Sequence, residues 1–234
     1  MKNLIVIVTT IFLLNSVCYS KGSKIIKQTE VDKFKETFTY GSYKEKKEAL
    51  NDIHLVDKTV AFDIIKLELE NYKWLNLREE VTEKLIYIDI ERTTPLVWKY
   101  LGDSIYNRRL EILSGIARAN NKKLINTVDK YRPKNIKEKI IIAYIYCKYK
   151  IRYKENISYL ISIVKDKQYY KKGVVEVGEE NYDGGSYAVY YLELLGDKKA
   201  LPALNKALEW ADGAYGEIIS EAIINIKNNS SRSK

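Results

Sequence analysis

The sequence predicts an all-α protein built as a row of antiparallel helix pairs. Apolar residues recur at helical spacing in segment after segment of the 234-residue chain. Only 3 prolines and 11 glycines interrupt the chain, which favours long helices over a fold with many turns. The second helices of successive pairs mostly begin about 30 residues apart, a period typical of helical solenoids. Together these observations predict an α-solenoid.

Residues 1–20 predict a secretory signal peptide. Lys2 supplies a positive charge, and an apolar run follows from Leu4 to Leu14. That run is too short to span a membrane, which takes about 20 residues. Two alternatives stay open: a buried N-terminal helix, and a lipoprotein signal that would attach the chain to a membrane through Cys18. Without the signal, Cys147 is the one cysteine left, so no disulfide forms within the exported chain.

Residues 21–227 form the predicted helical domain, and a polar, disordered tail is predicted over 228–234. Short connections force neighbouring helices to lie antiparallel. The second helix of each pair is predicted to begin near one of six residues: Ser42, Asn76, Ser104, Asn135, Gly184 and Gly213.

Capping and turn residues mark the ends of these helices. Three aspartates are predicted N-caps or turn residues, and two prolines are predicted in first turns, where a missing N–H costs nothing: Asp57, Asp103, Asp197, Pro95 and Pro202. Three glycines are predicted to make the tight reversals between helices: Gly102, Gly196 and Gly213.

One interval between helices is longer than the others, because residues 167–185 are inserted. Alternating residues between Gly173 and Gly178 predict a loop or a short β-hairpin there. Insertions in solenoids often reach a binding face, and tyrosines with a charged rim suit a partner-binding loop. A solvated loop without a partner is the alternative. The candidate residues are Tyr169, Tyr170, Lys171, Lys172, Glu179, Glu180, Tyr182 and Asp183.

The C-terminal stretch, residues 194–226, resembles a HEAT-like repeat of the short type found in relatives of phycobilisome lyases. The residues that carry the resemblance are Leu195, Gly196, Asp197, Ala200, Leu201, Pro202, Ala203, Leu204, Ala207, Leu208, Ala222 and Ile226. The resemblance implies a right-handed superhelix of helix pairs that serves as a protein-binding scaffold. It implies no catalytic residue, since all the matched positions are packing or turn positions.

The chain carries a formal net charge of +9, with its charges dispersed along the sequence. In an exported protein this favours an acidic protein surface, a cell-wall polymer or anionic lipid over nucleic acid. The acidic residues of the insertion lack EF-hand spacing, so no metal site is predicted. No cofactor is predicted either.

Catalytic motifs are missing from the sequence, and its one histidine, His54, leaves most acid–base triads without a member. We therefore predict an exported bacterial scaffold in the periplasm or cell envelope, without enzymatic activity. It would bind a protein or peptide on the concave face, lined by the second helices, or on the inserted loop. The alternative is a lyase- or hydrolase-type enzyme that uses groove carboxylates on a cell-wall or other polymeric substrate.

Overall fold

The structure, a computed structural model, describes residues 28–70, 77–170 and 184–229. These residues form twelve α-helices and five short 3-10 helices, and none of them lies in a strand. The all-α prediction is therefore confirmed for this part of the chain. The α-helices are α2 (Gln28–Tyr40), α3 (Tyr43–Asn51), α4 (Lys58–Ile65), α5 (Leu77–Ile88), α6 (Ile90–Leu101), α7 (Tyr106–Arg118), α8 (Ile125–Lys130), α9 (Ile136–Lys148), α10 (Tyr153–Lys165), α11 (Gly184–Leu195), α12 (Leu201–Leu208) and α13 (Gly213–Asn229). The 3-10 helices are η1 (Ile53–Leu55), η2 (Lys66–Leu69), η3 (Lys122–Leu124), η4 (Lys167–Tyr170) and η5 (Lys198–Ala200).

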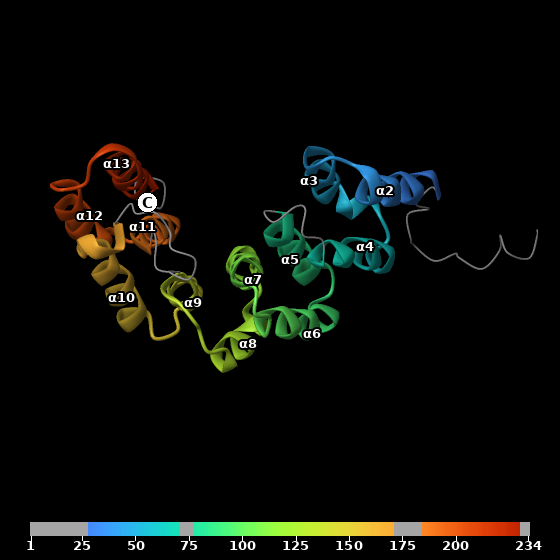
Figure 1. Cartoon of the computed structure of the whole chain (residues 1–234), viewed down its shortest axis with the longest axis horizontal. Coiled ribbons are helices and arrows are strands. Elements are labelled where there is room, and N and C mark those ends of the chain that lie inside the picture. Colours follow the sequence, from blue (N-terminus) through green and yellow to red (C-terminus); the bar gives the residue numbers. More distant parts are fainter. Residues whose placement is uncertain (1–27, 71–76, 171–183, 230–234) are drawn as a thin grey trace, which may run out of the picture.

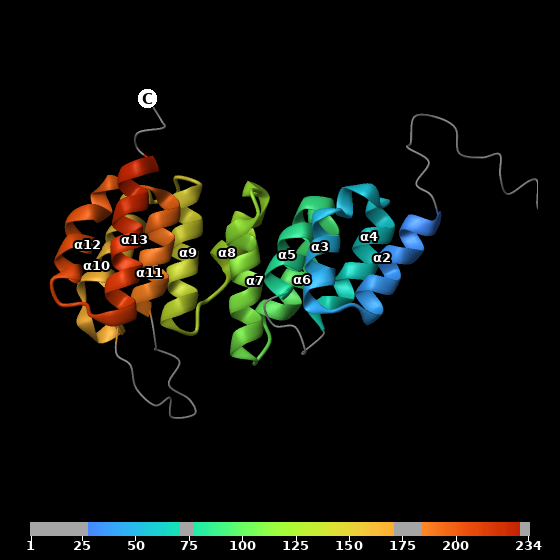
Figure 2. The same ribbon diagram turned by 90° about the horizontal axis from the view of Figure 1, so that it is seen from above.

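The helices lie in two layers along a curved row (Figure 1). The inner side of the curve is followed by α3, α5, α7, α9, α11 and α13, and the outer side by α4, α6, α8, α10 and α12. Seen from above, the helices stand side by side across the long axis of the molecule (Figure 2). Each of the six inner helices begins within two residues of a start predicted for a second helix.

Side chains at the helix ends account for several of these boundaries. Ser42 accepts a hydrogen bond from the Glu45 N–H, and the Glu45 carboxylate accepts one from the Ser42 N–H at 2.7 Å, a capping box that begins α3. Asp57 caps α4 as predicted. Gly196 and Gly213 have φ angles of +62° and +49°, a left-handed conformation that glycine adopts without strain.

The position of Pro95 differs from its prediction. This proline lies inside α6 and not in its first turn, because the helix begins at Ile90 with Asp89 as its N-cap. The Asp89 carboxylate accepts hydrogen bonds from the N–H groups of Glu91 and Arg92, both at 3.0 Å. The cap, and not the proline, therefore sets the start of α6.

A continuous apolar core lies between the two layers. The inner helices contact one another in succession, α5 with α7, α7 with α9, α9 with α11 and α11 with α13. Buried side chains line these contacts, and burying one of this size stabilises the fold by about 1.5–3 kcal/mol. They include Leu85, Ile112, Ile141 and Leu192. Cys147 is buried in the same core, and burial raises the pKa of its thiol to about 12.

Polar contacts between neighbouring units recur at nearly the predicted period. Arg109 donates to Glu138, 29 residues further along, and Arg78 donates to Glu111, 33 residues further along. Other side-chain hydrogen bonds span 29 to 32 residues: Arg92 to Asp63, Lys99 to Glu70, Lys148 to the Ala117 carbonyl, and Asn225 to Glu193. Several contacts between neighbouring helices therefore fall near the period read from apolar spacing, whereas others span 22, 35, 39 or 44 residues.

The predicted insertion is described only at its two ends. Residues 167–170 form η4, and Gly184 and Gly185 already belong to α11, so helical structure reaches into both ends of the segment. The predicted hairpin falls on residues 171–183, outside the described residues, as do the signal over 1–20 and residues 230–234 of the predicted tail. The first two residues of that tail, Asn228 and Asn229, belong to α13.

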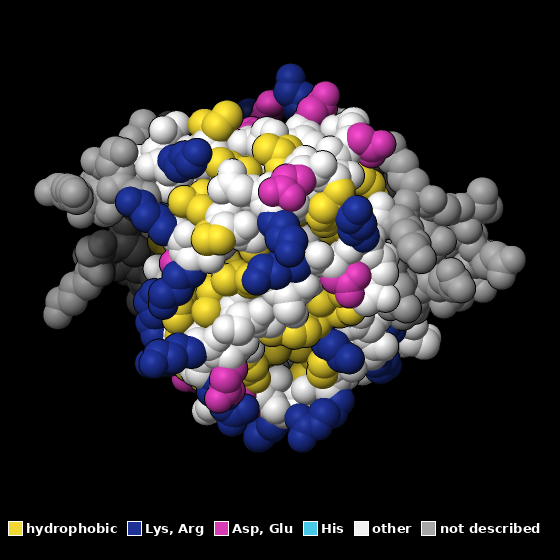
Figure 3. Space-filling model, turned by 90° about the vertical axis from the view of Figure 1, so that its left-hand side faces the viewer, with side chains coloured by type: hydrophobic (Ala, Val, Ile, Leu, Met, Phe, Trp, Pro, Cys, Tyr) yellow, Lys and Arg dark blue, Asp and Glu magenta, His cyan; other side chains and the backbone are white. Residues whose placement is uncertain are grey.

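The C-terminal end of the row exposes hydrophobic side chains between lysines and arginines (Figure 3). On the last two inner helices, the exposed large hydrophobic residues are Tyr190, Leu194, Ile218 and Ile224. Charged side chains interrupt the hydrophobic areas of the face seen in Figure 3, so this view shows no single continuous apolar surface.

Candidate binding surfaces

Two residues of the predicted binding loop, Tyr169 and Tyr170, lie in η4. Tyr170 is buried, with its ring edge-on to Trp210 and Tyr215 and its hydroxyl donating to the Val164 carbonyl at 3.2 Å. It therefore packs the C-terminal units together. The other candidates lie outside the described residues, and their binding role stays a prediction: Lys171, Lys172, Glu179, Glu180, Tyr182 and Asp183.

The inner layer carries a cluster of charged and aromatic side chains. Arg118, at the end of α7, donates to Glu83 at 2.9 Å and to Glu79 at 3.2 Å, both on α5. Tyr190 on α11 interacts electrostatically with Glu79 and Arg118, and burial raises the pKa of its hydroxyl. We call Glu79, Glu83, Arg118 and Tyr190 the inner-face cluster. Its ion pairs join α5 and α7, and Tyr190 on α11 is close enough to interact electrostatically with Glu79 and Arg118.

A group of tyrosines forms the base of this cluster. The rings of Tyr144 and Tyr191 lie 4.6 Å apart, and those of Tyr190 and Tyr191 lie 5.1 Å apart, edge to face. Burial raises the pKa of Tyr191, whose hydroxyl also hydrogen-bonds the side chain of Ser114. Tyr144 and Tyr191 are buried, whereas Tyr190 is 48% exposed. Tyr190 therefore presents an aromatic ring to solvent above two buried tyrosine rings.

Glu111 holds the buried guanidinium of Arg78 beside this cluster. Its carboxylate accepts a hydrogen bond from Arg78 at 2.9 Å, and the Arg78 side chain is completely buried. Burial raises the pKa of Glu111 to about 7, a larger effect than the lowering by Arg78. Burial also raises the pKa of the neighbouring Glu79. Both carboxyl groups therefore bind protons more tightly than ordinary glutamates.

The raised pKa of Glu111 gives a pH dependence of stability. Between pH 4.5, its ordinary pKa, and about pH 7, the folded chain holds a proton on Glu111 that the unfolded chain releases. Stability therefore falls as the pH rises through this window, by roughly 1–3 kcal/mol. Urea unfolding at pH 5 and pH 7.5 should show this loss for the natural chain and a smaller loss for Glu111→Gln, which cannot titrate. Equal losses in both proteins would contradict the raised pKa.

A polar groove of about 680 Å³ opens where α3, α5 and α7 end. His54 and Tyr87 line it together with the ion pair of Glu83 and Arg118 and the amide of Asn121. The His54 ring contacts the Asn51 carbonyl at 3.2 Å through Nδ1. The groove thus shares two residues with the inner-face cluster and extends it toward one edge of the row.

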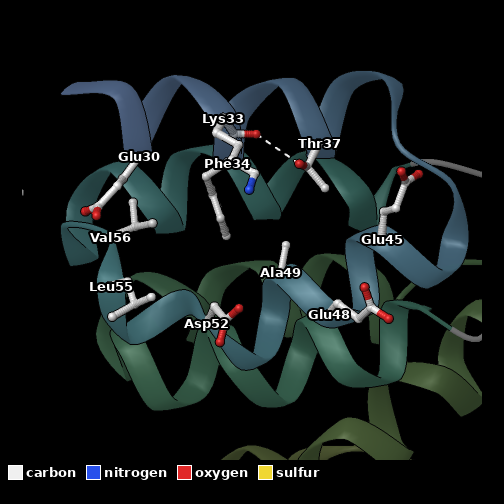
Figure 4. A pocket seen from close by; sticks show the side chains of 10 residues that line it. All are labelled: Glu30, Lys33, Phe34, Thr37, Glu45, Glu48, Ala49, Asp52, Leu55 and Val56. Atoms are coloured by element: carbon white, nitrogen blue, oxygen red, sulfur yellow. Dashed lines mark hydrogen bonds between the residues drawn. The ribbon is translucent and has the colours of Figure 1, made fainter. Parts of the chain in front are cut away.

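A second groove, of about 510 Å³, lies between α2 and α3. In Figure 4, Phe34 points from α2 toward Ala49 on α3, while Leu55 and Val56 close one end. Carboxylates surround this apolar floor: Glu30, Glu45, Glu48 and Asp52. Four of the ten lining residues are acidic and one, Lys33, is basic, in contrast to the positive charge of the whole chain.

The described residues contain no group of three or more His, Cys, Asp or Glu side chains placed to hold a metal ion. Among the helices described, none is long and apolar enough to cross a membrane. Comparison with family models, with curated proteins and with solved structures gave no match to this chain.

Sequence patterns predicted a role in binding or catalysis for none of the residues that form these surfaces. Glu79, Glu111 and Arg118 meet because α5 and α7 are neighbouring inner helices, which the apolar pattern alone does not reveal. A search for opposite charges about one repeat apart would have found Arg78 with Glu111, and Arg118 with Glu83. Both pairs lie within a few residues of the predicted period.

Proposed function

We propose that this chain is an exported, HEAT-like α-solenoid scaffold that binds a protein or peptide partner along its inner face. The observation that carries the proposal is a stripe of exposed side chains on the inner helix α11. Tyr190 is 48% and Leu194 is 50% exposed, and at a spacing of four residues they share one face of the helix.

Three features support a solenoid. The six inner helices follow one side of the curve in Figure 1, and the helices paired with them lie on the outer side. Successive inner helices contact one another, so each unit covers the apolar face of the next. Side-chain hydrogen bonds also recur 29 to 33 residues apart. The HEAT-like assignment and the right-handed superhelix rest on the C-terminal sequence motif together with this arrangement.

The composition of the inner face favours a protein partner. Tyrosine and arginine are the residues that most often dominate binding energy when a partner covers them. Tyr190 rests on the buried Tyr191, and two carboxylates hold Arg118, so both side chains are positioned before a partner arrives. Such pre-organisation lowers the entropy lost on binding.

The proposed location is the periplasm or cell envelope, and it rests on the predicted signal peptide over residues 1–20. The net charge of +9 would then favour an acidic partner surface.

One observation favours the alternative, a hydrolase or lyase acting on a polymer. The pKa of Glu111 is about 7, which is suitable for a general acid near neutral pH. However, its side chain is only 13% exposed and its carboxylate is bound to the buried Arg78. A scaffold explains these residues as a hydrogen-bonded support of the inner face, and we therefore propose no catalytic residue.

Site-specific photo-cross-linking tests the scaffold. Benzoylphenylalanine placed at Tyr190 should give one reproducible adduct with a partner protein in cells that export the chain. The same group at Tyr40, which is 84% exposed at the end of α2, is the matched control and should not give that adduct. Mass spectrometry of the adduct identifies the partner and shows whether residues 1–20 have been removed.

Two results would contradict the proposal: no adduct from position 190, or the same set of adducts from both positions. A chain recovered with residues 1–20 intact would contradict the proposed export by signal cleavage. With the partner identified, Tyr190→Ala should weaken binding about tenfold or more, the effect typical of an aromatic anchor.

A further inference from the structure

The groove between α2 and α3 has an apolar floor and an acidic rim, and it lies at the first hairpin of the described row (Figure 4). In a stack of helix pairs, each hairpin is covered by the one before it, and the first one needs a cap. Phe34 and Val56 already contribute to the core, whereas Leu55 remains 41% exposed. The groove therefore suits a short segment with both cationic and apolar side chains.

The chain itself contains such a segment directly before α2. Residues 21–27 read KGSKIIK, so Lys21, Lys24 and Lys27 accompany the apolar pair Ile25 and Ile26. We propose that residues 21–27 dock into the α2–α3 groove of the same chain, with the isoleucines on the apolar floor and the lysines at the carboxylates.

The reach of the segment agrees with this proposal. The groove follows α2 from Glu30 to Thr37, a distance of roughly 11 Å at the rise of an α-helix. Seven extended residues span up to roughly 23 Å. The segment joins α2 at Gln28, beside the Glu30 end of the groove, so it can turn back and run along it.

The charges of the rim also agree. Glu48 and Asp52 are exposed, and Glu45 is held ionised because hydrogen bonds from Ser42 lower its pKa. Lys44 approaches Glu48 only at 4.0 Å, with both side chains exposed. The rim therefore offers the docked segment several carboxylates in a chain that is otherwise positively charged.

Disulfide trapping tests the docking in the full chain with Cys18→Ser. Ile26→Cys is combined with Ala49→Cys, which lines the groove, and in a control chain with Lys47→Cys. Lys47 lies two residues from Ala49 but pairs with Glu80 on α5 at 2.7 Å, so it faces away from the groove. The buried Cys147, with its raised thiol pKa, does not compete.

In a glutathione buffer, the disulfide between positions 26 and 49 should form within one chain at least about tenfold faster than the control bond, because docking raises the local thiol concentration. Glu48→Lys with Asp52→Lys should remove most of this advantage. Equal rates for the two pairs would overturn the proposal. A disulfide that joins two chains would also overturn it, since it would make a second copy the occupant. Neither result bears on the inner-face scaffold, because the two surfaces are tested separately.

Discussion

Replacing Glu138 by alanine should lower the free energy of unfolding by about 3–5 kcal/mol, the range measured when one partner of a buried ion pair is removed. The Glu138 side chain is fully buried at the start of α9. Its carboxylate accepts hydrogen bonds from Arg109 Nε at 2.8 Å, from the Tyr131 hydroxyl at 2.7 Å and from the Lys134 N–H at 2.7 Å. Alanine at this position leaves the buried guanidinium of Arg109 without that carboxylate. Urea unfolding followed by circular dichroism measures the loss.

The interactions of Glu70 with Lys99 and Tyr100 provide a matched control. Glu70 also accepts from a cation, at 2.6 Å, and from a tyrosine hydroxyl, at 3.1 Å, but its side chain is 60% exposed. Glu70→Ala should therefore have a much smaller effect, because water solvates the charges left behind. The double change Arg109→Met with Glu138→Leu should recover much of the loss. Similar losses for Glu70→Ala and Glu138→Ala would show that burial does not set the strength of this network.

The helix boundaries were largely predictable from sequence because they depend on local chemistry. Asp57, Asp197 and Asn135 each cap the following helix through their own side chains. Pro202 lies in the first turn of α12, as predicted. The error at Pro95 has a local cause as well. Asp89 offers a stronger start six residues before the proline, and the helix accommodates the missing N–H in its interior.

The apolar repeat predicted the packing positions of the C-terminal unit. Half of the residues that suggested the HEAT-like motif are buried almost completely: Ala200, Ala203, Leu204, Ala207, Ala222 and Ile226. Small residues at these positions allow α12 to lie close to α13. The motif leucines Leu195, Leu201 and Leu208 are partly buried against the same core. A pattern of size and hydrophobicity is sufficient to predict such contacts.

The candidate surfaces were not predictable in the same way. The inner-face cluster needs the curvature of the row, which brings Tyr190 near Glu79 although they are 111 residues apart in the sequence. The α2–α3 groove lies at the end of the described row. The sequence alone does not show which residues the neighbouring hairpins leave uncovered there. Tyr170 shows the opposite limit. A tyrosine in a charged loop was predicted to be a surface anchor, but Tyr170 is buried. Gly185 leaves room for the Tyr170 ring against α11, because a Cβ atom on residue 185 would lie 2.5 Å from that ring.

The contact between α5 and α7 gives the second large effect. Gly115 lies at the centre of this contact, where an added Cβ atom would come within 2.5 Å of the Thr82 Cβ and 2.7 Å of the Glu79 carbonyl oxygen. Both distances are far below van der Waals contact, and one of the two atoms belongs to the backbone. Gly115→Ala should therefore force the two helices apart and lower the free energy of unfolding by about 1–3 kcal/mol, while Gly115→Val should lower it further.

The sign of the change in the free energy of unfolding distinguishes a tightly packed glycine from one with free space. Alanine favours a helix over glycine by about 1 kcal/mol, so a helical glycine with free space becomes more stable on this substitution. Gly102, at the end of α6, is the control, since its φ is −74° and its nearest contact would be 3.4 Å. Gly102→Ala should leave stability unchanged or raise it slightly. If Gly115→Ala behaved in the same way, α5 and α7 would not be in close contact. In that case the helix spacing that brings Arg118 to Glu79 and Glu83 would have to come from other contacts.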